Sequence, residues 1–200
     1  YEAATAYCEW LTLQYNNAPD KKFKKVKFRL PSLDEWQIAA ASIKNPTSWK
    51  LVDQEVEVIL SPPGKEFDRN AEKRKVSMDN PEIQYPWFRF YGVRNSPINN
   101  KGCYLGNFKA DPCDCPGYKG NKPVHYDGFA MMAPTKSYFP NDLGLYDVVG
   151  NVAEMINEKG KACGGSWNHP PAESTIRSVS TYTHPDAAVG FRVFMEIIEK

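Results

Sequence analysis

The middle of the chain, residues 85–140, has almost no hydrophobic periodicity of either the helical or the strand kind. Glycine, proline, asparagine and aromatic residues interrupt one another throughout it. A long irregular segment inside a compact domain is uncommon, and it usually marks a functional region or a bound stabiliser such as a metal ion. Every buried amide in such backbone needs a hydrogen-bond partner. The sequence therefore predicts an α+β domain whose interior is largely irregular backbone.

Regular elements are expected before this segment. Residues 1–15 have the pattern of an amphipathic helix. Its predicted apolar stripe consists of Ala3, Ala4, Tyr7, Trp10 and Leu11. The stretch "KVKFRL", residues 25–30, alternates apolar and polar positions, as a half-buried strand does.

Further elements follow on both sides of the irregular segment. In "PSLDEW", Ser32 and Glu35 have the spacing of a capping box, which predicts the start of a second helix. "EVEVIL", residues 55–60, is a strand candidate, and residues 61–84 are polar and proline-rich enough to be a long exposed excursion. "GFRVFMEII", residues 190–198, alternates and predicts a final strand.

Composition narrows the class of protein. The 200 residues have the length of one domain, and the 42% that are hydrophobic suffice for a packed core. The 25 basic residues balance the 24 acidic ones, so nucleic acid is not an expected partner. No apolar stretch reaches the ~18–20 residues that span a bilayer, and the chain contains no signal peptide. The cysteines have no zinc-binding spacing, and their odd count argues against a complete disulfide framework. They are Cys8, Cys103, Cys113, Cys115 and Cys163.

Two groups of oxygen-bearing side chains lie in or beside the irregular segment. Asp147 and Glu154 flank a Val-Val-Gly-Asn turn in "GLYDVVGNVAEM", so their carboxylates can converge on one point with backbone carbonyls. Asn107 and Asp127 form a second pair, separated by a loop. Oxygens of mixed side-chain and main-chain origin are the ligands that Ca²⁺ prefers. The alternative interpretation is that these residues cap backbone groups in turns.

Five stretches occur in one order along the chain: "RLPSLDEWQIAA", "YPW", "FPNDLGLYDVVGNVAEM", "GGSW" and "GFRV". In this order they resemble the formylglycine-generating enzyme (sulfatase-modifying factor) family, from Tyr1 to about Met195. The resemblance implies a single loop-rich α+β domain over residues 1–200, related in outline to C-type lectins and containing calcium. In that family the pattern seen here in "ATAYCEWL" lies well inside the domain, so the N-terminal part of the domain is expected to be missing.

The resemblance also implies the ligands of two calcium ions, the expected cofactor. One ion would bind Asn107, the carbonyl of Phe108, Asp127 and the carbonyl of Phe129. The other would bind Asp147, the carbonyls of Gly150 and Val152, and Glu154.

Copper chemistry is not expected. Family enzymes that make formylglycine hold Cu(I) between two cysteine thiolates after "GGS", since soft thiolates suit this soft ion. His169 and Ser174 stand at these positions in "CGGSWNHPPAES", and a serine hydroxyl is a poor ligand for Cu(I). Cys163 is expected on a strand, outside the pocket. Ala153 and Met155 replace the aromatic residues of the family pattern "G-N-x-W-E-W". These departures from the family pattern favour a domain that has no catalytic activity.

Two alternatives stay open. A metal-dependent oxidoreductase of the same superfamily would need an iron site or an altered copper site, with His125, His169 and His184 as candidate ligands. A lectin-like receptor would bind its ligand through residues near "GGSW" and "GFR". Such a surface would include Thr175, Ile176, Ser178, Tyr182 and Thr183.

The function expected first is a calcium-stabilised, non-catalytic binding or structural module that docks a protein partner in a cell-envelope complex. The resemblance is to members typical of Bacteroidota, often exported lipoproteins, and related members take part in gliding motility and type IX secretion. It implies the periplasm or the outer-membrane surface, with a lipid anchor on the missing N-terminal part. The stretch "YPWFRFYGV" has the composition of a protein-binding face, and core packing is its alternative interpretation.

Overall fold

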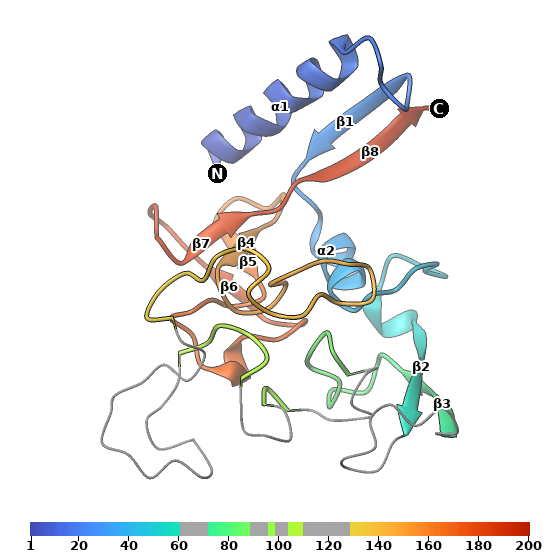
Figure 1. Cartoon of the computed structure of the whole chain (residues 1–200), viewed down its shortest axis with the longest axis vertical. Helices are drawn as coiled ribbons and strands as arrows, with labels where there is room; N and C mark the ends of the chain where they lie inside the picture. The colour runs from blue at the N-terminus through green and yellow to red at the C-terminus, as the bar shows by residue number, and fades with distance from the viewer. Residues whose placement is uncertain (61–71, 89–95, 99–103, 110–128) are drawn as a thin grey trace.

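The computed structural model describes residues 1–60, 72–88, 96–98, 104–109 and 129–200, coloured in Figure 1. Within them the chain forms two α-helices, two short 3-10 turns and eight strands. The strands make three small sheets, with orders β1-β8, β2-β3 and β6-β5-β4-β7. Few helices and small sheets joined by long loops agree with the predicted loop-rich α+β class. No helix in the described part of the chain is long and apolar enough to cross a membrane.

Helix α1 (Glu2–Asn17) packs on the antiparallel pair β1 (Lys25–Arg29) and β8 (Phe194–Glu199), at one end of the molecule (Figure 1). The predicted helix and first strand are therefore confirmed. The pairing joins an early strand to the last one, so this end of the fold depends on contacts between distant parts of the sequence.

The predicted apolar stripe of α1 is wrong in part. Ala4 and Cys8 are buried, whereas Tyr7 and Trp10 are 44% and 52% exposed. The Tyr7 ring contacts Trp10 and Phe191 at centroid distances of 5.7 and 5.8 Å. Small residues face the strands because the helix lies close to them, and the large aromatic rings are left at the edge.

Helix α2 (Leu33–Ala40) begins with the predicted capping box. Ser32 Oγ accepts the Glu35 N–H at 3.2 Å, and Glu35 Oε2 accepts the Ser32 N–H at 2.8 Å. The same carboxylate accepts two hydrogen bonds of 2.7 Å from the guanidinium of Arg29, the last residue of β1. One glutamate therefore both caps α2 and joins it to β1.

Strand β2 (Glu55–Leu60) is the predicted strand, and it pairs antiparallel with β3 (Glu72–Ser77). The predicted exposed excursion over residues 61–84 is wrong in two respects: β3 is a regular strand, and Met78 and Ile83 are buried. Most side chains of β3 are exposed and charged. This segment is extended because it pairs with β2. No alternation of hydrophobic residues in its own sequence predicts that it is a strand. Residues 61–71 lie outside the described part.

A four-stranded sheet forms the centre of the molecule (Figure 1). Its strands are β4 (Ala153–Met155), β5 (Lys161–Cys163), β6 (Val179–Thr181) and β7 (Val189–Phe191). Strand β4 pairs antiparallel with β5 and parallel with β7. The single strand predicted in "GFRVFMEII" is two strands, because the chain leaves the central sheet after β7 and joins β1 as β8. Short 3-10 turns at Leu51–Asp53 and Pro171–Glu173 complete the regular structure.

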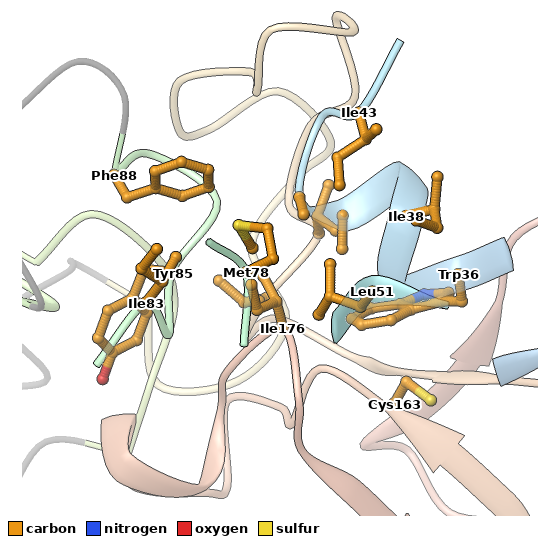
Figure 2. Close-up of a cluster of buried hydrophobic side chains, with 14 of the residues drawn as sticks. Trp36, Ile38, Ile43, Leu51, Met78, Ile83, Tyr85, Phe88, Cys163 and Ile176 are labelled. Carbon is orange, nitrogen blue, oxygen red and sulfur yellow. The ribbon is translucent and has the colours of Figure 1, made fainter. Parts of the chain in front are cut away.

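The main hydrophobic core lies between α2, β2 and the irregular segments (Figure 2). Trp36 is 1% exposed, and the thiol of Cys163 belongs to the same cluster, which agrees with its predicted place on a strand. Tyr85 and Phe88 are also core residues. The core interpretation of "YPWFRFYGV" is therefore confirmed for these two rings, and residues 89–93 lie outside the described part.

Lowering the pH should weaken the junction of β1 and α2. Hydrogen bonds from Arg29, with a smaller part from Ser32, lower the pKa of Glu35 from 4.5 to about 2. A carboxyl with a lower pKa in the folded state stabilises the fold above pH 4.5, and this contribution is lost as the pH falls towards about 2. Urea denaturation between these pH values should show a falling free energy of unfolding, with a shallower fall in Glu35→Gln. The exposed Glu57→Gln should behave as the wild type. An unchanged slope in Glu35→Gln would contradict this assignment.

Candidate functional site

A buried carboxylate, Glu154 in β4, connects three distant parts of the chain. It is 4% exposed, and its Oε2 accepts the indole N–H of Trp36 from α2 at 2.8 Å. Arg192, the residue after β7, places Nε 3.1 Å from Oε1 and 3.0 Å from Oε2. Its Nη2 lies 2.6 Å from Oε1. We call these three residues the Glu154 hub; it ties α2 to the two parallel strands of the central sheet.

Arg192 also holds the loop that leads into β4. Its Nη2 donates to the carbonyl of Tyr146 at 2.8 Å. Burial acts to lower the pKa of the guanidinium, but the charge and hydrogen bonds of Glu154 outweigh it, so the pKa is raised. Arg192 therefore stays cationic and fixes this loop to the central sheet.

Asp147 follows directly in that loop and adopts a left-handed φ of 53°. Its Oδ2 accepts the backbone N–H of Lys136 at 3.0 Å, while Oδ1 is buried and has no hydrogen bond of good geometry in the described part of the chain. Burial raises the pKa of this carboxyl, against the opposing effects of the Lys136 N–H, the Arg192 charge and the Tyr138 N–H. The carboxylate therefore caps backbone N–H groups of the turn, as the alternative interpretation predicts.

Gly150 makes the turn between the two carboxylates. Its φ is 72°, and a Cβ at this position would lie 2.4 Å from the carbonyl oxygen of Asn107. Only glycine tolerates both conditions. Its N–H donates to the carbonyl of Gly164 at 2.9 Å, so the turn is fastened to the "GGSW" loop.

Two buried amides join the irregular segments around this turn. Asn107 Nδ2 donates to the carbonyl of Met131 at 2.7 Å and lies 3.2 Å from Asn151 Oδ1. Asn151 Oδ1 also accepts the N–H of Ala133 at 2.8 Å. Asn107 is 1% exposed, and its Oδ1 has no hydrogen-bond partner in the described part of the chain. The amide is thus held by its nitrogen with its oxygen unused.

The remaining predicted calcium ligands are only partly placed. Phe108 follows Asn107 and is fully buried, and Phe129 is half-buried. Asp127 lies outside the described residues. In the other set, Val152 directly precedes β4 and Glu154 lies within it. The structure thus brings Asp147, Gly150, Val152 and Glu154 into one loop and strand, but it engages Glu154 with Trp36 and Arg192.

The side chains between "GGSW" and η2 (Pro171–Glu173) contact one another or the backbone. Ser166 Oγ lies 2.6 Å from His169 Nδ1. Ser174 is fully buried, and a Cβ on Gly165 would lie 2.2 Å from its Oγ. The two positions that the sequence resemblance assigns to copper ligands therefore hold an imidazole hydrogen-bonded to a serine and a hydroxyl packed against backbone.

The residues predicted for the two alternative functions are only partly placed, and two of them are buried. Thr175 and Ile176 are 6% and 0% exposed, so these two predicted members of a lectin-like surface are interior residues. His184 is exposed, with Nδ1 2.7 Å from Thr183 Oγ1. His125 lies outside the described residues.

An apolar pocket of about 310 Å³ borders the loop that begins at Asp147. Val148 and Val149, beside Asp147, line one part, and Trp87 lines another. Further lining residues come from the irregular segments: Pro86, Leu105, Gly106, Tyr138, Phe139, Pro140, Asn141 and Leu145. Such a volume lies at the lower end of the ~300–1,000 Å³ typical of ligand sites.

The polar lining groups largely face the protein. Trp87 Nε1 donates to the carbonyl of Ser96 at 3.0 Å. Asn141 Nδ2 donates to the carbonyl of Ala39 at 2.9 Å, and its Oδ1 accepts the Leu143 N–H at 3.0 Å. The pocket therefore offers a ligand mainly apolar contacts, because these hydrogen-bonding groups are already engaged within the protein.

Sequence reasoning named the carboxylates but missed their partners. Arg192 stood in the quoted motif "GFRV" without a role, and Asn151 stood in the turn beside Gly150. A signal was present for both, since a lone arginine inside an apolar strand and an asparagine after a turn glycine each need a buried partner.

The chain combines a loop-rich α+β fold with a turn before β4 that is hydrogen-bonded to the "GGSW" loop. The family model of the sulfatase-modifying factor enzyme 1-like domain matches residues 1–197, and the chain belongs to this family. No curated protein gives a significant match.

Solved structures share the fold at low sequence identity. PvdO from Pseudomonas aeruginosa has a TM-score of 0.52 at 17% identity, over 99% of this chain and 60% of that one. CarF has a TM-score of 0.45 at 21% identity, over 86% of this chain and 49% of that one. Treponema denticola variable protein 1 has a TM-score of 0.44 at 16% identity, over 90% and 53%. The chain thus spans between about half and three fifths of these proteins.

Removing the carboxylate of the hub should strongly destabilise the fold. Glu154→Ala leaves the Arg192 charge and the Trp36 N–H without their acceptor, and breaking a buried ion pair from one side costs about 3–5 kcal/mol. Urea denaturation measures the change in the free energy of unfolding. Glu158→Ala removes a carboxylate with 52% exposure and should change the free energy by less than about 1 kcal/mol. Equal, small effects of both substitutions would contradict the role of the hub.

Proposed function

We propose that the chain is a non-catalytic sulfatase-modifying factor-like domain that docks a protein partner in a cell-envelope assembly. The observation that carries the proposal is the apolar pocket beside the Asp147 loop, together with the exposed ring of Phe139 at its edge. The absence of the two copper cysteines supports a function in binding rather than oxidation.

The environment of Ser174 supports the lack of copper chemistry. Its hydroxyl is buried against Gly165 and reaches no solvent. His169 Nδ1 is engaged with Ser166 at 2.6 Å. A soft Cu(I) ion prefers thiolates, and these two positions offer it a hydroxyl and an imidazole with one nitrogen engaged.

The rim of the pocket supports docking of a protein. Phe139 lines the pocket, yet 82% of it is exposed, and Leu143 nearby in the sequence is 39% exposed. A small molecule inside the pocket would leave most of this apolar surface in water, whereas an apolar side chain on a partner protein would cover the pocket and rim together.

Calcium is proposed as a stabiliser of the irregular segments, with Asn107 as its best-supported ligand. The buried Oδ1 of Asn107 has no described hydrogen-bond partner, and the Phe108 carbonyl is next to it in the chain. Phe129 and Asp127 would supply the remaining protein oxygens implied by the sequence. An ion there would join segments that the Asn107 amide already brings together.

We place this module in the periplasm or on the outer-membrane surface, following the sequence resemblance to exported lipoproteins of Bacteroidota. Docking within a gliding-motility or type IX secretion complex, and a lipid anchor outside this sequence, belong to the same proposal.

Replacing Phe139 with serine should weaken partner binding about tenfold, because the substitution removes an exposed apolar anchor. The partner is first captured by a photo-crosslinking amino acid at position 139 in native cells, then purified for calorimetry. Val52→Ser, at an exposed residue of the 3-10 turn Leu51–Asp53, should leave the affinity unchanged. Both variants should keep the wild-type melting temperature. Wild-type affinity in Phe139→Ser would sink the docking proposal.

Removing calcium should lower the melting temperature. An ion that saturates its site at 100 times its Kd contributes about 2.7 kcal/mol, which is a shift of about 5–10 °C for a domain of this size. Differential scanning calorimetry with EGTA and with excess CaCl₂ measures the shift, which Asn107→Ala should abolish. Asn141→Ala also removes a buried amide but should keep the shift. A wild-type melting temperature unaffected by EGTA counts against calcium.

A further inference from the structure

The oxygens predicted for the second calcium ion do not fit a metal ion in this structure. Ca²⁺ binds 6–8 oxygens, and this loop would supply them from Asp147, Gly150, Val152 and Glu154. Asp147 Oδ1 is buried and has no hydrogen bond of good geometry in the described part of the chain, so it could still turn to an ion. Glu154, the other carboxylate of the set, does not, because it is already bound on both oxygens.

Three N–H groups of the protein already bind the two oxygens of Glu154. A carboxylate offers about four lone-pair directions. Oε1 accepts from Arg192 Nε and Nη2, and Oε2 accepts from Arg192 Nε and Trp36 Nε1. A metal ion would have to displace one of these donors, and each donor is itself held in the core or by the loop.

The guanidinium of Arg192 also reaches the other parts of the predicted site. It donates to the carbonyl of Tyr146, the residue before Asp147, at 2.8 Å. It is also near enough to Asp147 for their charges to attract. The positive charge of Arg192 thus interacts with Glu154, with the loop carbonyl and with Asp147. The same charge repels a divalent cation from this space.

We propose that Arg192 is the resident cation of the loop from Asp147 to Glu154. Its guanidinium does there what a calcium ion would do, by neutralising Glu154, holding the Tyr146 carbonyl and attracting Asp147. The loop therefore keeps its shape without metal, and calcium binds there only when the charge of Arg192 is removed.

This arrangement has a consequence for the pocket. Asp147, Val148 and Val149 line it and belong to the loop that Arg192 holds. An internal cation cannot dissociate when calcium is scarce, so this wall of the pocket is independent of the calcium concentration. Calcium dependence, where present, comes from the Asn107 set.

The test counts calcium ions per chain by equilibrium dialysis and elemental analysis. The proteins are the wild type, Asp147→Asn, Arg192→Met and the double variant Arg192→Met/Asp147→Asn, each checked by circular dichroism. Asp147→Asn keeps an oxygen to cap the Lys136 N–H but removes the ligand charge. Arg192→Lys, which keeps a cation, is the matched control for Arg192→Met.

We expect equal calcium contents in the wild type, Asp147→Asn and Arg192→Lys. Arg192→Met should bind one ion more, and the double variant should lose it again. Terbium emission excited through Trp36, whose indole contacts Glu154, should appear in Arg192→Met and be weaker in the double variant. Any ion in the Asn107 set is common to all these proteins, so its absence would refute that calcium site without touching this inference.

Two results would overturn the proposal. The first is one calcium ion fewer in Asp147→Asn than in the wild type, which would show metal in the loop beside Arg192. The second is a folded Arg192→Met that gains no ion. If Arg192→Met does not fold, the comparison of the wild type with Asp147→Asn decides alone, because it leaves Arg192 intact.

Discussion

The fold depends on one buried charge and the two groups that neutralise and bind it. Burying a carboxylate is costly unless cations and N–H groups replace water around it. Glu154 receives both, from Arg192 and from the indole of Trp36. Since these residues come from α2, β4 and the end of β7, satisfying the charge also sets how the helix meets the central sheet. Small sheets with few strands gain from such a joint, because they have little other regular contact with each other.

Sequence reasoning succeeded where the cause is local. The capping box at Ser32 and Glu35 needs only residues three apart, and the alternation in β1 and β2 is a property of each strand. It failed where the pairing of strands decides which segments become regular structure. Strand β3 is charged and exposed and becomes a strand through β2, and the final alternating stretch divides between two sheets. The stripe on α1 was misjudged because close approach to β1 selects Ala4 and Cys8 over larger rings.

The candidate site likewise has some features that the sequence predicts and others that it does not. Asp147 and Gly150 were predictable, since a carboxylate and a glycine in a tight turn have few other uses. The contacts of Glu154 were not, because its register opposite Gly190 brings Arg192 near only after β4 and β7 pair in parallel. Likewise, the pocket is made by segments that are close only in three dimensions, and Phe139 gave no signal that it would be 82% exposed. Buried amides fasten the irregular backbone here, which would keep the ordering entropy of the proposed docking low.

The parallel pairing of β4 and β7 sets an order of events during folding. Between these strands the chain must form β5, β6 and the "GGSW" loop, and Arg192 follows only after β7. The contacts that close the hub span 118 and 38 residues, so much of the loop-closure entropy is lost before the charge is satisfied. Closing the hub is therefore a long-range step. During synthesis, Trp36 leaves the ribosome long before Glu154 and Arg192 exist, so the hub can close only after Arg192 has emerged.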